Sequence, residues 1–253
     1  DRAAADRIMR LPVDRVFTVN GIGTVVTGTL WDGTVALNDR VSLLPSVIET
    51  RVRTIQVHGK DVETAQSGQR VALGLAGISK DAVERGCFIV KERLAPPSDS
   101  LDVLFEYCGI PGSGKAFETG SRVHIAHGTT EVLGRVLLMD DRPVLETGNQ
   151  CFAQIRLEEP LAARYGDRFI VRSYSPVYTM GGGQVLASHP KRRTRLSAEE
   201  RLFLDARLAH DDTEALLTTL RQASHPLLST DLATRLDMTE EYLADRAIHP
   251  KIE

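Results

Sequence analysis

The stretch that most constrains the fold runs from Leu11 to Leu30. Two runs rich in β-branched residues flank Asn20-Gly21, and Asn-Gly is the strongest short-range signal for a tight β-hairpin turn. Gly28 within the second run permits a bend or bulge of the kind that closes a barrel. The first run is interrupted by two opposite charges, Asp14-Arg15, just before Phe17. Charges at this place indicate either a solvated strand edge or one wall of a binding pocket.

Short strands separated by turn signals continue to residue 90, which indicates a β-sandwich or a closed barrel. The expected strands are 13–19, 23–30, 39–44, 51–58, 69–75 and 87–90. A stiff spacer, 94–100, contains Pro96-Pro97 and separates this block from a second one. The second block has expected strands at 101–107, 121–126, 130–139, 151–157 and 168–173, and a last one after residues 181–183. The sequence therefore predicts a mainly β fold with two tandem barrels, 1–94 and 98–190.

From Ser188 onward, helix patterns replace strand patterns. A basic linker at 189–195 precedes a capping box, 197–200, and a helix with leucines at helical spacing. The capping pattern recurs at 211–214 before a second helix. Residues 225–243 then have the form of a helix, a short turn and a helix. We therefore expect residues 191–253 to form a winged-helix module, which the chain either completes or leaves incomplete.

The composition is that of an ordinary globular protein, with 42% hydrophobic and 26% charged residues among 253. No apolar run approaches the roughly 20 residues of a membrane span. The three cysteines are widely spaced and form no Cys-x-x-Cys pair, so we expect reduced, packed thiols in a cytoplasmic protein. With a formal net charge of −3, any nucleic-acid contact must come from local patches. Because the chain opens on Asp1, we expect it to be an excised part of a longer protein.

Three motifs that carry chemistry elsewhere lack their structural context in this sequence. Gly109–Ala116 matches the phosphate-binding pattern GxxxxGK, but Ala116 replaces the Ser or Thr that binds magnesium, and no helix is expected to follow. His124 and His127 lack the spacing and partners of a zinc site. Gly181–Gly183 indicates close backbone packing or a strand bend, not dinucleotide binding. We therefore predict no catalytic site, no metal site and no cofactor of its own for this chain.

Several stretches, taken in order, resemble one known family. Residues 11–29 resemble the second domain of translational GTPases such as elongation factor Tu, and residues 168–183 resemble the last strands of that factor's third domain. The specialised relative that fits better is the bacterial selenocysteine-specific elongation factor, and the stretches closer to it are 51–58, 68–73, 128–136 and 173–183. The resemblance covers residues 10–195 strongly and the helical tail weakly.

The resemblance implies that the complete protein delivers selenocysteinyl-tRNA to the ribosome at recoded stop codons. It implies a GTP-binding domain before this chain, with GTP and Mg as cofactors, and further winged-helix modules after it that bind an mRNA hairpin. The expected partners are selenocysteinyl-tRNA, the ribosome, that hairpin and the protein's own GTP-binding domain, with no membrane contact. The factor is expected to be monomeric, and its GTPase activity would not reside in this chain.

The family holds the aminoacyl end of the tRNA on its second domain, in a pocket whose lining corresponds to Asp14, Arg15, Phe17 and Arg70. In elongation factor Tu the position of Arg15 is acidic and that of Arg70 is uncharged. A selenol ionises more readily than a thiol or a hydroxyl, so two arginines suit an anionic selenocysteinyl group. Asp14 would hold one arginine or accept from the aminoacyl amine. The tRNA body is expected on the second barrel, with the candidates His127, Arg135, Arg172 and Tyr174.

Other functions stay open at this point. The chain would fit another translational GTPase that handles ordinary aminoacyl- or initiator-tRNA, although Arg15 and Arg70 argue against it. A DNA-binding regulator would use the helix-turn-helix, but its second helix near 239–246 is acidic, which disfavours docking on phosphates. An enzyme interpretation would rest on Lys115 alone and would require nucleotide binding. The basic cluster 191–195 is either an RNA contact or a solvated linker.

Overall fold

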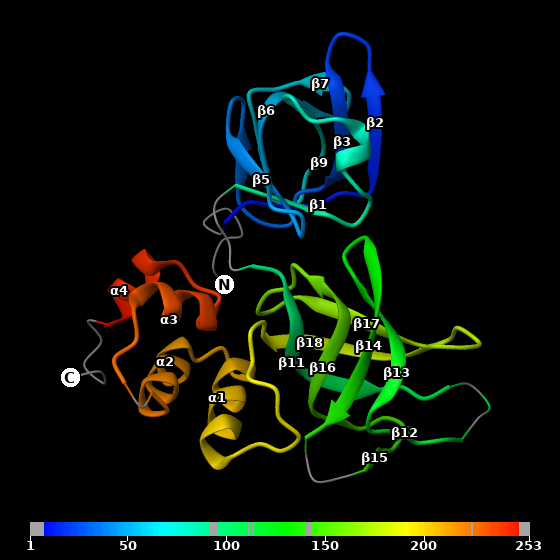
Figure 1. Ribbon diagram of the computed structural model, residues 1–253, viewed down its shortest axis with the longest axis vertical. Coiled ribbons are helices and arrows are strands. Elements are labelled where there is room, and N and C mark those ends of the chain that lie inside the picture. Colours follow the sequence, from blue (N-terminus) through cyan, green and yellow to red (C-terminus); the bar gives the residue numbers. More distant parts are fainter. Residues whose placement is uncertain are drawn as a thin grey trace. The chain divides into compact units, whose positions relative to one another are not determined.

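The computed structural model describes residues 8–91, 96–110, 112, 114–139, 143–223 and 225–247 (Figure 1). Both chain ends and residues 94 and 95 of the predicted spacer lie outside these described residues. The chain divides into two compact units. The first comprises residues 1–97 with 128–131, and the second comprises residues 98–127 with 132–253. The structure is mainly β, as the sequence predicts.

The first unit is an antiparallel sheet that curls around an apolar core, in the order β1-β10-β5-β6-β9-β3-β2, with β7 beside β6. Its strands are β1 (Arg10–Pro12), β2 (Arg15–Val19), β3 (Gly23–Thr29), β5 (Arg40–Leu44), β6 (Ile48–Val57), β7 (Lys60–Asp61), β9 (Arg70–Leu75) and β10 (Phe88–Val90). A separate two-stranded ribbon consists of β4 (Thr34–Ala36) and β8 (Thr64–Gln66), and a short 3₁₀ helix, η2, spans Lys80–Ala82. Figure 1 shows these strands wrapped around a common centre.

One stretch of chain, residues 10–19, supplies both edges of this sheet. Its first part, β1, pairs with β10, and its second part, β2, pairs with β3. At the junction, the Val13 N–H donates to the Cys87 carbonyl at 2.9 Å and the Asp14 N–H donates to the Thr27 carbonyl at 2.9 Å. The stretch thus links the two edges, but no strand ladder joins β1 to β2. The first unit is therefore a half-barrel where the sequence predicted a barrel.

Gly28 is needed because β1 and β3 approach each other closely. A Cβ atom at this position would overlap the carbonyl oxygen of Pro12 and lie 2.9 Å from Cδ1 of Leu11. The β3–β9 register runs through Gly28 without a shift, so the predicted bend or bulge is replaced by a close approach of two strands. This packing holds the Pro12–Asp14 junction against β3.

The second unit contains a closed antiparallel barrel in the order β11-β16-β14-β13-β17-β18, which confirms the barrel predicted for this half. Its strands are β11 (Ser98–Tyr107), β13 (Ser121–His127), β14 (Thr130–Leu138), β16 (Gln150–Leu161), β17 (Arg168–Ser173) and β18 (Thr179–Ala187), and a separate ribbon pairs β12 (Phe117–Glu118) with β15 (Val144–Leu145). The glycines at 181–183 face neighbouring backbone: a Cβ on Gly183 would overlap the Leu104 carbonyl oxygen. The expectation of close backbone packing there is confirmed.

In the described part of the chain after the barrel, four helices follow: α1 (Ala198–Leu208), α2 (Asp212–Arg221), α3 (Ser229–Leu236) and α4 (Glu240–Ala247). Ser197 and Glu200 form the predicted capping box, and Asp211 accepts from the Glu214 N–H as predicted. The turn between α3 and α4 begins at Asp237, which adopts a left-handed conformation (φ 51°). The described residues after 188 contain helices and no wing strands, so the winged helix stays a prediction. None of these helices is long and apolar enough to cross a membrane.

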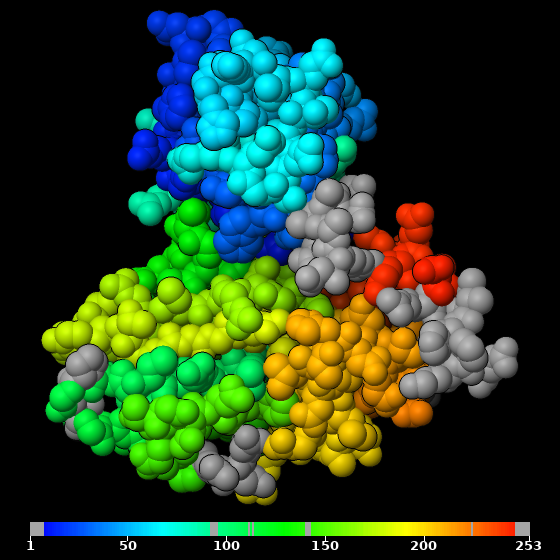
Figure 2. Space-filling view, turned by 180° about the vertical axis from the view of Figure 1, so that it is seen from behind, coloured from blue at the N-terminus to red at the C-terminus, as the bar shows by residue number. Residues whose placement is uncertain are grey.

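The helices pack onto the barrel through a small second core and a buried arginine. Leu204 of α1 is buried with Phe152 and Leu186 of the barrel, and Figure 2 shows the gold and orange helices directly beside the barrel strands. The side chain of Arg207 is 1% exposed and donates to the carbonyls of Leu186 (3.2 Å) and Leu236 (2.9 Å). Arg207 therefore connects the barrel to the helix-turn-helix.

The basic linker that precedes α1 is tied to the barrel by ion pairs. Arg193 pairs with the buried carboxylate of Asp102, and its Nε atom lies 3.3 Å from Oε1 of Glu200. Arg192 donates to Asp99 at 2.7 Å. Desolvation raises the pKa of Asp102, an effect that the neighbouring Arg193 opposes. Two linker arginines are thus already neutralised, which favours a structural role for this segment over an RNA contact.

The three cysteines are all free thiols, but they differ in exposure. Cys87 and Cys151 are buried as expected, whereas Cys108 is exposed, so the expectation of packing is wrong for Cys108. Burial raises the pKa of the Cys87 thiol to about 12, so almost none of it is thiolate near pH 8. We expect iodoacetamide at pH 8 to alkylate Cys108 at once and Cys87 only after urea unfolding, as measured by peptide mass spectrometry. Equal labelling rates in the folded chain would contradict the packing of Cys87.

Candidate functional site

The predicted pocket residues of the first unit lie on one outer face, across β2, β3 and β9. Arg15 of β2 stands opposite Thr27 of β3, and Thr29 of β3 stands opposite Arg70 of β9. Because side chains alternate along a strand, Phe17 lies on the same side of β2 as Arg15. Phe17 is 38% exposed. Strand pairing therefore gathers residues that are more than 50 positions apart in the sequence.

Asp14 and Arg70 form a bidentate ion pair at the centre of this face. The Arg70 Nη1 atom lies 2.6 Å from Asp14 Oδ2, and Nη2 lies 3.1 Å from Oδ1. The Thr27 hydroxyl donates to Asp14 Oδ1 at 2.7 Å, which fixes the carboxylate from a second side. The hydrogen bond from Arg70 lowers the pKa of Asp14, and Asp14 in turn raises the pKa of Arg70. Both groups are therefore charged at neutral pH.

Arg15 remains available beside this pair. Its side chain is exposed, and it makes no ion pair with any residue that the structure describes. Two guanidinium groups against one carboxylate leave this face with a net charge of +1. Of the five N–H donors of Arg70, the contacts to Asp14 occupy two, so others stay free for a further acceptor. The arrangement is suited to bind a small anion between Arg15 and Arg70.

The structure favours one of the two roles considered for Asp14. Its carboxylate already accepts hydrogen bonds from Arg70 and Thr27, so it acts as the anchor that positions Arg70. The exposed fraction of the Arg70 side chain is 51% and that of Asp14 is 25%, which places the pair at a rim and not in a closed cavity.

Two of the four candidates for the tRNA body, Arg172 and Tyr174, lie on one face of the second barrel. Arg172 on β17 is paired with His124 on β13, and the ring of His124 stacks on Tyr174 with centroids 5.9 Å apart. The guanidinium carbon of Arg122 lies 4.6 Å from the Tyr174 ring centroid. Tyr174 is 49% exposed. The face thus combines an accessible aromatic ring with Arg172 and His124, and with Arg122, whose charge Glu158 offsets.

Arg122 and His124 belong to this face although sequence reasoning did not assign them to it. The sequence feature that could have placed them there is alternation, because Arg122 and His124 alternate along β13 with the buried Val123 and Ile125 and therefore point outward. Arg122 also makes a bidentate pair with Glu158, with both N–O distances at 2.7 Å. That pairing lowers the pKa of Glu158, and the charge of Arg135 contributes in the same direction.

The remaining two candidates differ in exposure. Arg135 is exposed and donates to the Gly120 carbonyl at 2.9 Å. His127 is 1% exposed, with Nε2 at 2.9 Å from the carboxylate of Asp167. This burial argues against a direct contact between His127 and RNA and favours a role in holding the barrel together.

The loop with the GxxxxGK pattern leads into the short strand β12 and not into a helix, as the sequence predicts. The Lys115 carbonyl accepts a hydrogen bond from the Tyr107 hydroxyl at 2.8 Å. Residues 111 and 113 of this loop lie outside the described residues. Within the described parts of the chain, no group of three or more His, Cys, Asp or Glu side chains is arranged to hold a metal ion.

Comparison with known proteins finds relatives for both units. Residues 23–90 match the family described as elongation factor Tu domain 2, and residues 113–192 match the beta-barrel domain of selenocysteine-specific elongation factor. The selenocysteine-specific elongation factor of Desulfomicrobium baculatum is 36% identical over 242 residues, which cover 95% of this chain and 37% of that protein. The chain is a relative of the selenocysteine-specific elongation factors. The resemblance recognised in the sequence is confirmed.

Two further selenocysteine-specific elongation factors agree with this relationship. That of Haemophilus influenzae is 30% identical over 251 residues, which cover 96% of this chain and 39% of that protein. The crystal structure of a bacterial selenocysteine-specific elongation factor, EF-Sec, superposes with a TM-score of 0.71 at 27% identity, covering 93% of this chain and 36% of that one. The chain therefore spans less than two fifths of the length of these relatives.

Proposed function

We propose that this chain supplies the tRNA-binding barrels of a factor that delivers selenocysteinyl-tRNA to the ribosome, and that the first unit holds the aminoacyl end. The observation that carries the proposal is the rim where Asp14 fixes Arg70 while Arg15 stays unpaired among the described residues. The relationship to selenocysteine-specific elongation factors supports it.

At this rim, a selenolate would accept hydrogen bonds from Arg15 and from the free donors of Arg70. Charge-assisted hydrogen bonds of this kind are about twice as strong as neutral ones. A seryl group is neutral and would leave Arg15 without an anion, whereas Arg70 keeps Asp14 as its partner in both cases. The discrimination against serine therefore falls mainly on Arg15, with Arg70 as a positioned second donor. Phe17 would cover the aminoacyl group from the side.

The tRNA body would lie along the face formed by His124, Arg172 and Tyr174, with Arg135 at its margin and with Arg122, which Glu158 holds, beside the ring of Tyr174. Exposed aromatic rings can stack on bases or riboses, and arginines contact phosphates. We further propose the domain division 1–94, 98–190 and 191–253. GTP and Mg would be bound by a separate GTP-binding domain, an mRNA hairpin by separate winged-helix modules, and the factor would act as a monomer.

The test is a binding titration of the complete GTP-bound factor with its tRNA charged either with selenocysteine or with serine. The proposal predicts clearly tighter binding of the selenocysteinyl form. Equal affinities would overturn the anion pocket and favour a factor for ordinary aminoacyl-tRNA. Tight binding of duplex DNA with no response to either tRNA would favour the regulator interpretation instead.

A further inference from the structure

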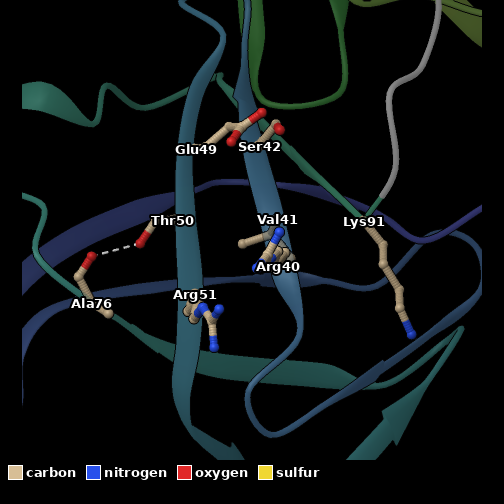
Figure 3. A pocket seen from close by; sticks show the side chains of 8 residues that line it. All are labelled: Arg40, Val41, Ser42, Glu49, Thr50, Arg51, Ala76 and Lys91. Carbon is tan, nitrogen blue, oxygen red and sulfur yellow. Dashed lines mark hydrogen bonds between the residues drawn. The ribbon is translucent and has the colours of Figure 1, made fainter.

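A second cationic site lies on the first unit, away from the aminoacyl rim. It is a hollow of about 470 Å³ between β5, β6 and the chain after β9 and β10 (Figure 3). The residues that line it are Arg40, Val41, Ser42, Glu49, Thr50, Arg51, Ala76 and Lys91. Arg70 begins β9 and Ala76 follows its end, so at about 3.3 Å per residue the two sites are roughly 20 Å apart along this strand.

Two arginines face each other across the strands that line this hollow. Arg40 of β5 is the direct cross-strand partner of Arg51 of β6, and Figure 3 shows both side chains projecting to the same side. Like charges placed directly opposite in a sheet are destabilising. Both side chains are exposed, and neither forms an ion pair with a residue that the structure describes. The fold therefore holds two like charges opposite each other without a direct ion pair to either among the described residues.

The other polar groups of the hollow show which ligand would fit it. Lys91 is already paired with Asp39 at 3.1 Å, and the Thr50 hydroxyl donates to the Ala76 carbonyl at 2.6 Å. Among the described residues that line the hollow, the cations that still need an anion are therefore the two arginines. At the other end, Glu49 stands opposite Ser42 and contributes a carboxylate, which repels a second anion and accepts from hydroxyl or amino donors.

We propose that this hollow binds one nucleotide of an RNA backbone, with the phosphate on Arg40 and Arg51 and the ribose toward Glu49. Its volume falls within the range of about 300–1,000 Å³ that is common for small-ligand sites. The 2′-hydroxyl is the donor that RNA offers and DNA lacks, and Glu49 is the acceptor placed beside the phosphate site. This contact goes beyond the aminoacyl rim because it does not depend on the amino acid that the tRNA carries.

The test measures the fluorescence anisotropy of a fluorescein-labelled, 12-nucleotide single-stranded RNA with the full chain over a series of salt concentrations. Arg40→Gln/Arg51→Gln should lower the affinity on the order of tenfold. The slope of log affinity against log salt should fall by about 0.7 for each phosphate that the variant no longer neutralises. The matched control is Lys60→Gln/Arg85→Gln, which removes two exposed cations outside the hollow and should change both values much less.

Thermal unfolding and a DNA probe separate a binding defect from a folding defect. The arginine double variant should unfold at a temperature no lower than the unchanged chain, because a like-charge pair has been removed. A DNA of the same sequence should bind more weakly, and Glu49→Ala should reduce that difference. Unchanged RNA affinity in the folded arginine variant, or an equal loss in the control, would overturn the proposal, as would tighter binding of an oligoglutamate peptide than of RNA.

The two sites can fail independently. In the complete factor, Arg40→Gln/Arg51→Gln should weaken the binding of selenocysteinyl- and seryl-tRNA by the same factor, so their affinity ratio stays constant. A change in that ratio would assign these arginines to the aminoacyl rim and overturn a separate backbone site. A constant ratio with weaker binding supports the backbone site whether or not the factor prefers selenocysteine.

Discussion

Replacing Arg15 and Arg70 together by alanine is expected to remove the preference for selenocysteinyl-tRNA over seryl-tRNA. The double variant removes the donors that distinguish an anionic selenolate from a neutral hydroxyl. Truncating one member of a buried charge pair costs about 2–5 kcal/mol, and an exposed rim lies at the lower end of this range or below it. A free-energy difference of about 2 kcal/mol corresponds to roughly thirtyfold in affinity. The measurement is the ratio of the two dissociation constants with the complete GTP-bound factor.

Two controls separate the anion site from a general loss of charge. Arg85→Ala removes an exposed arginine outside the rim and should leave the affinity ratio unchanged. Asp14→Asn removes the carboxylate that fixes Arg70 but keeps both guanidinium groups, so a preference for the selenocysteinyl form should persist in this variant. A preference that survives the double alanine variant would place the discriminating residues elsewhere.

The contribution of the Asp14–Arg70 ion pair to the stability of the fold depends on pH in a predictable way. Because Arg70 lowers the pKa of Asp14 in the folded state below the ordinary value of 3.8, the pair stabilises the fold fully above that value. This contribution disappears as the pH falls through the lower, folded-state pKa. The rim is therefore fully charged throughout the neutral range, and pH changes there act on the bound selenol and not on Asp14.

Local signals made much of this architecture predictable. The Asn20-Gly21 turn, the alternating strands and the capping box at Ser197 each depend on residues close in sequence, whose conformational preferences act without tertiary partners. The outward direction of Arg70 also follows from alternation alone. The side of the sheet to which a strand residue points can therefore be predicted from the sequence.

Which side chains meet on a given face of the sheet was not predictable. Contacts between segments that are distant in sequence depend on the register of the strand pairs and on how the sheet closes. Asp14 and Arg70 are 56 positions apart, and only the β2–β3–β9 pairing brings them together. Alternation with the buried Val123 and Ile125 already places His127 on the inward face of β13, whereas its partner Asp167, 40 positions away, could not be predicted. The half-barrel likewise reflects the missing ladder between β1 and β2, although residues 10–19 form both sheet edges, and no local pattern encodes this.

Arg207 is the clearest example of a contact beyond the reach of sequence patterns, because an arginine on an amphipathic helix is ordinarily solvated. Here its guanidinium carbon lies 3.3 Å from the centroid of the Tyr165 ring, and its Nη1 lies 3.6 Å from Asp212. Burial lowers the pKa of Arg207, and the charges of Asp212 and Asp237 counteract this effect. The Asp237 side chain is itself 1% exposed and accepts from the Tyr165 N–H at 2.9 Å.

Arg207→Met is therefore expected to destabilise the second unit by about 3 kcal/mol, because removing one partner of a buried charge network leaves the others without compensation. For a chain of this size, this predicts a decrease in Tm of about 6–12 °C if the unit unfolds cooperatively. Arg221→Met is the matched control, because the Arg221 side chain is 64% exposed and its ion pair with Glu214, at 3.3 Å, lies at the surface of the neighbouring helix α2. This control should change Tm by much less, since exposed ion pairs contribute little to stability.

Hydrogen exchange then distinguishes the loss of a local contact between the helices and the barrel from a destabilisation of the whole second unit. If Arg207 joins the helices to the barrel, amides of α1 and α3 should exchange faster in Arg207→Met while those of β13 and β14 keep their protection. Uniformly faster exchange would show that Arg207 supports the whole unit. Unchanged exchange would show that the apolar contacts of Leu204 and the contact of Asp237 with Tyr165 hold the helices without Arg207. The first outcome is expected because Arg207 supplies the polar contacts from α1 to both the barrel carbonyl of Leu186 and the α3 carbonyl of Leu236.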